Sequence, residues 1–175
     1  MYGPLGAGKK TRLNCLLKGL FGPVAEKLRL ETLTFQVPSG KKVDINLVCS
    51  SYHIELNPSD VGVYDRHIIQ DVIKQSASTV QLDPNLHKKF KGILVIHSVI
   101  VIMEADRLTK DAQQALRRTM EKYSESCRII LLSESLSPII DPIQSRCLCV
   151  DNPCAKSGVI SQMWSKMSKP RNPVL

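Results

Sequence analysis

A glycine-rich loop at the start of the chain constrains the fold more than any other stretch. Gly3, Gly8 and Lys9 stand at the spacing G-x-x-x-x-G-K of a phosphate-binding loop. In such a loop the backbone N–H groups point at phosphate oxygens, and the lysine supplies a positive charge. The hydroxyl that should follow the lysine and ligate Mg²⁺ is displaced, because Lys10 stands there and Thr11 comes one residue late. Taken alone, the loop is also compatible with a glycine-rich turn that opens an ordinary helix.

A helix is predicted directly after the loop, because leucines recur at helical spacing over 11–20 and Gly22-Pro23 follows. A phosphate-binding loop needs this helix, and it also needs a strand before it. Only Met1 and Tyr2 precede Gly3, so we expect a truncated form of a nucleotide-binding domain. The candidate nucleotide-binding residues are Gly3, Gly6, Gly8, Lys9, Lys10 and Thr11.

A second candidate motif lies near the middle of the chain, where the apolar residues 99–102 lead into Met103, Glu104, Ala105 and Asp106. In ATPases with a phosphate-binding loop, such a strand ends in an Asp that holds Mg²⁺, often followed by a Glu that polarises water. Met103 stands at the Asp position, and a thioether has little affinity for a hard cation. Glu104 stands at the water-activating position, although a buried strand that ends in a charged turn is the plainer alternative. Because Lys10 and Met103 each replace a metal ligand, we expect nucleotide binding with little or no hydrolysis.

The rest of the chain alternates predicted strands and helices. Strands are predicted at 28–37, 43–47, 52–56, 93–103, 127–132 and 147–150, and helices at 11–20, 63–76, 109–123 and 138–144. This alternation predicts an α/β fold with a parallel sheet and right-handed crossovers. We expect one domain over 1–150 and a poorly ordered tail over 151–175.

Composition narrows the class of partner. The 175 residues carry 24 Lys and Arg against 16 Asp and Glu, a net charge of +8, which favours polyanions and nucleic acid first. The six cysteines form no C-x-x-C pair, so we expect reduced thiols in an intracellular protein and no metal site. The longest mostly apolar run, 93–103, is too short to span a bilayer, so no membrane partner is expected.

Four further motifs follow the opening loop in order. They are Leu56-Asn57-Pro58-Ser59-Asp60, the stretch 108–113, the stretch 115–123 and Ser145-Arg146-Cys147. Together with the loop they resemble a small subunit of replication factor C, an AAA+ clamp loader. The doubled lysine and the Glu-x-Asp without a leading Asp are most similar to its subunit 3. The resemblance covers about residues 1–150, and we expect the match to fail beyond Val150.

The resemblance implies a partial AAA+ ATPase core in which the helical lid and the collar domain are absent. It implies ATP or ADP as the cofactor, although the two replaced ligands argue against Mg²⁺. It also implies a nuclear complex of replication factor C subunits. That complex uses ATP to open the sliding clamp PCNA and place it on primer–template DNA.

The resemblance also implies roles for individual residues. Arg146 matches an arginine that reaches into a neighbouring subunit's ATP site, where an arginine finger stabilises transition-state charge; a surface ion pair is the alternative. Arg66, Lys74 and Lys110 lie on predicted exposed helix faces and are candidate contacts to DNA phosphates, although any one of them is also compatible with simple solvation. Glu134 stands where the family has a sensor asparagine, which argues further against hydrolysis.

Two other functions stay open on the residues alone. The chain could be an independent ATPase, which Lys10, Met103 and Glu134 speak against, or a non-catalytic basic DNA-binding module explained by its charge. The segment 92–98 resembles an insertion ahead of the second motif.

Overall fold

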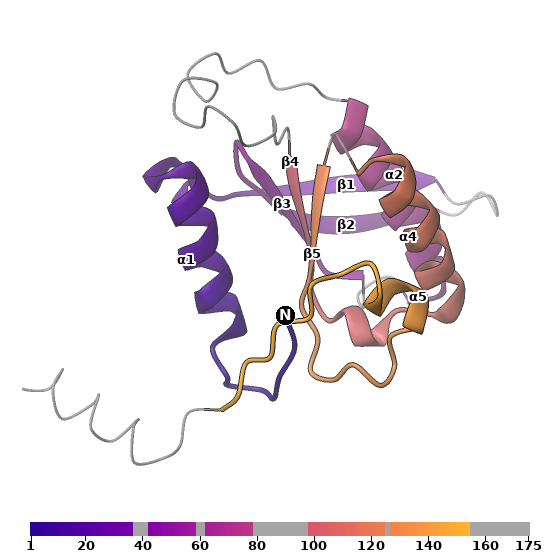
Figure 1. The fold of residues 1–175 in the computed structure, drawn as a ribbon. Coiled ribbons are helices and arrows are strands. Elements are labelled where there is room, and N and C mark those ends of the chain that lie inside the picture. Colours follow the sequence, from indigo (N-terminus) through magenta and orange to yellow (C-terminus); the bar gives the residue numbers. More distant parts are fainter. Residues whose placement is uncertain (37–41, 59–61, 79–97, 125–126, 155–175) are drawn as a thin grey trace, which may run out of the picture.

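The computed structural model describes residues 1–36, 42–58, 62–78, 98–124 and 127–154 (Figure 1). Its elements are α1 (Lys9–Phe21), η1 (Pro23–Glu26), β1 (Arg29–Gln36), β2 (Lys42–Cys49), β3 (His53–Leu56), η3 (Gly62–Tyr64), α2 (Asp65–Ser78), β4 (Ser98–Ile102), η4 (Ala105–Arg107), α4 (Lys110–Lys122), β5 (Cys127–Leu131) and α5 (Asp141–Gln144). Residues 59–60 of the motif at 56–60 and residues 92–97 of the predicted insertion lie outside the described residues.

Five strands form one sheet in the order β1-β2-β3-β4-β5. The pairs β3–β4 and β4–β5 are parallel, as the sequence predicted, and this confirms an α/β fold. The pairs β1–β2 and β2–β3 are antiparallel, so the sheet is mixed. Only short connections, residues 37–41 and 50–52, join these strands, whereas a parallel crossover needs a dozen or more residues.

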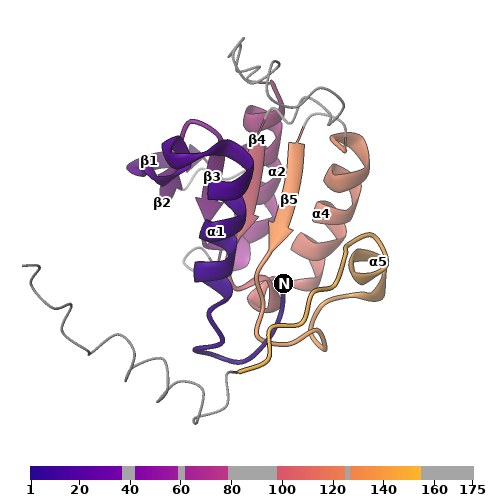
Figure 2. The same cartoon turned by 60° about the vertical axis from the view of Figure 1, so that its left-hand side comes forward.

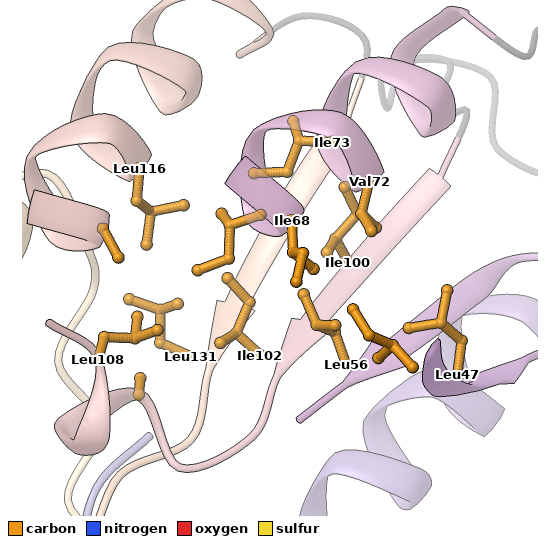
Figure 3. Packing of buried hydrophobic residues seen from close by; sticks show 14 of the residues in the cluster. Leu47, Leu56, Ile68, Val72, Ile73, Ile100, Ile102, Leu108, Leu116 and Leu131 are labelled. Carbon is orange, nitrogen blue, oxygen red and sulfur yellow. The ribbon is translucent and has the colours of Figure 1, made fainter. Parts of the chain in front are cut away.

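Helices cover both faces of the sheet. Helix α1 lies on one face, and α2, α4 and α5 lie on the other (Figures 1 and 2). The alternation of β4 explains this division, because successive strand residues point to opposite faces. Val99 and Val101 pack with Leu13 and Leu17 of α1. The neighbouring isoleucines of β4 join the larger core under α2 and α4, together with Leu47, Leu56, Ile68, Ile73, Leu116 and Leu131 (Figure 3).

The first two residues lie in extended backbone beside β5. Tyr2 forms isolated parallel bridges to Ser133 and Asp151. The Tyr2 N–H donates to the Val150 carbonyl at 3.0 Å, and the Tyr2 carbonyl accepts from the Asn152 N–H at 2.8 Å. This short segment therefore leads into the glycine-rich loop from the sheet. The predicted strand 147–150 does not form, and the bridge at Asp151 is the only ladder contact that the described residues make there.

Candidate nucleotide site

The glycine-rich loop owes its shape to backbone conformations that favour glycine. Gly6 and Gly8 have φ angles of +77° and +75°, in the left-handed region, and Gly8 is the N-cap of α1. At Gly3 the constraint is space, because an added Cβ would lie 2.2 Å from the Asn152 carbonyl oxygen. The loop ends at the N-terminus of a 13-residue helix, where unpaired N–H groups favour an anion.

The Lys9 side chain folds back over this loop. Its ammonium donates to the Gly3 carbonyl and, at 2.9 Å, to the Pro4 carbonyl. A phosphate in the loop would therefore meet a positive charge already held at the site. The loop glycines and Lys9 fit the phosphates of a nucleotide, whereas the Thr11 side chain is exposed on α1.

Lys10 contacts a residue that the sequence analysis missed. Its ammonium lies 3.2 Å from the carboxylate of Glu55, which is only 4% exposed in β3. His53 lies two residues earlier in β3, on the same face of the sheet, with its Nε2 atom 3.9 Å from the other Glu55 oxygen. Burial lowers the pKa of His53, and the Glu55 charge opposes part of this shift. An acidic residue that alternates with the apolar Ile54 and Leu56 in a predicted strand was the available signal.

The second motif lies at the end of β4, with its two key residues in different environments. Met103 is half-buried against the α1 cluster, and its N–H donates to the Leu56 carbonyl at 2.8 Å. Glu104 has a φ angle of +49°, and its carboxylate pairs with Arg107 at 3.2 Å. The predicted carboxylate is thus held in an ion pair, next to a thioether.

These residues do not fit Mg²⁺. The two ligand positions hold the Lys10 ammonium, which repels a cation, and the Met103 thioether, which binds hard cations poorly. Within the part of the chain that the structure describes, no group of three or more His, Cys, Asp or Glu residues could hold a metal ion. Glu134, at the predicted sensor position, is exposed, and its N–H lies 3.4 Å from Asp106 Oδ1.

Arg146 is not brought together with the loop of its own chain. It follows α5, a helix that lies on the face of the sheet opposite α1 (Figure 2). Its guanidinium pairs with Glu121 at 2.6 Å and donates to the Pro142 carbonyl at 2.7 Å. About a third of its side chain (34%) is exposed. In this single chain it therefore makes the surface ion pair that was the alternative to a finger role.

The candidate DNA contacts are all exposed. Arg66 and Lys74 belong to α2, and Lys110 begins α4. The two helices lie side by side over the same face of the sheet (Figures 1 and 2). A basic surface could therefore draw on both helices.

Two buried polar residues join the elements around this face. Asp65, at the start of α2, accepts from the Thr109 N–H at 2.8 Å and from its hydroxyl at 3.0 Å. Gln113 in α4 donates to the Leu108 and Pro138 carbonyls and accepts from the Ile140 N–H. Neither was singled out from the sequence, although Gln113 belongs to the stretch 108–113 that carries part of the resemblance.

The comparisons with known proteins agree with this architecture. A family model described as DNA polymerase III, delta subunit, matches residues 36–153. Replication factor C subunit 3 of Homo sapiens is 48% identical over 169 residues, which is 97% of this chain and 46% of the relative. Replication factor C subunit 5 of Neurospora crassa is 53% identical over 150 residues, 86% of this chain and 41% of the relative. The chain thus spans about half the length of the curated relatives it matches.

The resemblance to replication factor C is therefore confirmed. Its predicted limit is wrong for the human relative, because a match that ended at Val150 could not cover 97% of the chain. Over the described residues, the structure has no helix with the length and apolar character needed to cross a membrane. The chain belongs to the family described as DNA polymerase III, delta subunit, and has subunits 3 and 5 of replication factor C among its relatives.

Proposed function

We propose that this chain acts as a subunit, or part of a subunit, of the replication factor C clamp loader. That complex uses ATP to load the PCNA sliding clamp onto primer–template DNA in replication and repair, so its place is the nucleus. The single observation that carries the proposal is the 48% identity to a replication factor C subunit along 97% of this chain. The glycine-rich loop before α1 and the net charge of +8 support it.

Within that complex the chain holds ATP or ADP and hydrolyses it little. The loop glycines and Lys9 contact the phosphates, and the exposed Thr11 lies one residue beyond the usual hydroxyl position. The Met103 thioether and the Glu104–Arg107 ion pair both speak against an independent ATPase. We then expect ATP hydrolysis at the sites of neighbouring subunits.

Arg146 supplies an arginine finger to one of those sites. Its pair with Glu121 of α4, a helix on the face of the sheet opposite α1, and its partial exposure support action on a second chain. The Glu121 contact holds the guanidinium at the surface until a phosphate competes for it.

Arg66, Lys74 and Lys110 contact the phosphate backbone of primer–template DNA. Their exposure on two adjacent helices supports this role. Such contacts position the duplex without reading its sequence, and binding should weaken as salt rises.

Co-expression with the other replication factor C subunits tests the proposal. We expect the chain to co-purify with them and the purified complex to load PCNA onto primed DNA when ATP is present. A chain that folds but never co-purifies with these subunits contradicts the proposal. DNA binding that persists without the partners, together with failed assembly, would favour a non-catalytic basic DNA-binding module.

A further inference from the structure

A line of polar side chains runs beneath α1 and ends at the glycine-rich loop. The Ser50 hydroxyl lies 2.8 Å from His53 Nδ1, and His53 Nε2 lies 3.9 Å from Glu55 Oε1. The other oxygen, Glu55 Oε2, lies 3.2 Å from the Lys10 ammonium. Strand alternation places His53 and Glu55 on the α1 side of the sheet, whereas Leu56 packs into the opposite core.

Glu55 is unusual because it is almost fully buried and incompletely paired. Its side chain is 4% exposed, and its Oε1 atom has no hydrogen-bond partner. A buried carboxylate is costly unless an opposite charge stands close to it. Lys10 is the nearby cation that the structure gives it, so the Lys10 ammonium is held at one place.

That place suits a phosphate group. Lys10 lies in the first turn of α1, directly after the loop lysine, and 56% of its side chain remains exposed. An ammonium has three N–H donors, so the contact to Glu55 leaves others for a ligand. Met103, the second metal-ligand position, offers only a thioether to a cation.

We propose that Glu55 is a positioning residue of the nucleotide site and that its pair with Lys10 takes the place of a bound divalent cation. The inference rests on the proposed nucleotide-binding function. Lys10 then contacts the phosphates of a nucleoside diphosphate or triphosphate directly. Nucleotide binding by this chain is consequently independent of Mg²⁺.

The test measures binding of fluorescent ADP and ATP to the full 175-residue chain, with Mg²⁺ or with EDTA. The wild-type affinity should be the same in both conditions, to within about twofold. Glu55→Gln should weaken binding roughly tenfold, the effect of losing one charge-assisted hydrogen bond. The matched control is Lys18→Thr, which breaks an exposed pair between Lys18 of α1 and Glu26 of η1 and should leave affinity unchanged.

Two substitutions of Lys10, whose side chain is largely exposed, test the proposal even where Glu55→Gln fails to fold. Lys10→Arg retains the charge and should retain binding in EDTA. Lys10→Gln can still donate to Glu55 but lacks the charge, and it should lose binding in EDTA by roughly tenfold. Thermal unfolding of each variant separates lost binding from lost fold.

The possible failures are distinguishable. Wild-type binding that requires Mg²⁺ overturns the role of the pair while leaving the clamp-loader assignment intact. Equal affinities for the Lys10→Gln and Lys10→Arg chains also overturn it. Absence of any nucleotide binding overturns it as well, whereas the clamp-loader assignment is decided separately by co-purification.

Discussion

The Arg146 guanidinium contacts the Glu121 carboxylate at 2.6 Å and so joins the segment after α5 to the last turn of α4. A second donor of the same guanidinium reaches the Pro142 carbonyl at 2.7 Å. Two contacts fix the orientation of a side chain that is one-third exposed. Such pre-organisation lowers the entropy lost when an arginine engages a phosphate.

Arg146→Ala is therefore expected to lower the ATPase rate of the assembled loader. An arginine finger is worth about a thousandfold or more at the site it reaches. Nucleotide binding by this chain should remain intact, because, among the described residues, the polar contacts of the Arg146 side chain are to Glu121 and Pro142 and not to the loop. The measurements are steady-state ATPase of the complex and nucleotide titration of the chain alone.

Arg117→Ala is the matched control, because Arg117 also pairs with Glu121, at 3.6 Å, but lies outside the Ser-Arg-Cys motif. It should leave the ATPase of the complex close to the wild-type rate. An unchanged rate for Arg146→Ala in a verified complex would reject the finger role.

Much of the fold could be predicted because its signals are local. The leucines of α1 and the apolar run of β4 have spacings that one element alone explains. The antiparallel pairing of β1 with β2 was missed, although a five-residue connection at 37–41 favours a hairpin over a crossover. Alternation along a strand identifies its faces but does not specify its neighbour's direction.

The candidate site was predictable only in its loop. The loop can be identified from the sequence by the spacing of Gly3, Gly8 and Lys9. The Glu55–Lys10 pair joins residues 45 positions apart in the sequence, and no periodicity links them. Likewise Gly3 is required because Asn152, from the far end of the described chain, lies against it. Contacts of this kind depend on the tertiary structure.

Lys9→Met should lower nucleotide affinity at least tenfold, because it removes the positive charge held over the loop carbonyls. Titration with fluorescent nucleotide measures this change. Lys27→Met alters an exposed lysine outside the loop and serves as the control. Equal losses in both variants would mean that general charge, and not the loop, binds the nucleotide.

Asp65→Ala should destabilise the fold by about 2–3 kcal/mol, because the Thr109 N–H and hydroxyl lose their buried acceptor. Thr109 itself caps α4 by accepting from the Ala112 N–H, so both helix starts are affected. Urea unfolding gives the free energy. Asp111→Ala, at an exposed position of the same turn, should change it by no more than about 0.5 kcal/mol.

Gln113→Leu should cost about 2–4 kcal/mol, because the Ile140 N–H and the Leu108 and Pro138 carbonyls all lose a partner. The matched control is Gln114→Leu, which makes the same change at the exposed neighbouring position. Urea unfolding of the two variants should differ by most of that free energy. Similar midpoints would show that the Gln113 contacts contribute little.

Stability should fall as the pH drops below about 6.5, the ordinary pKa of histidine. Burial lowers the pKa of folded His53. Between that lowered pKa and pH ~6.5, the unfolded chain therefore binds a proton that the folded chain does not bind. The stability that depends on neutral, buried His53 is therefore fully present above pH ~6.5. It is lost as the pH falls towards the lowered pKa of folded His53. One such proton gives a slope of up to about 1.4 kcal/mol per pH unit.

Comparison of the free energy of unfolding of wild type and His53→Gln across this range measures the His53 contribution, and the variant should show the shallower dependence on pH. The groups that contact His53 are the Ser50 hydroxyl and the Glu55 carboxylate, and Glu55 itself forms an ion pair with Lys10. His67→Gln removes an exposed histidine from α2 and should keep the wild-type slope. If His53→Gln and wild type share one slope, the His53 proton does not distinguish the folded from the unfolded chain.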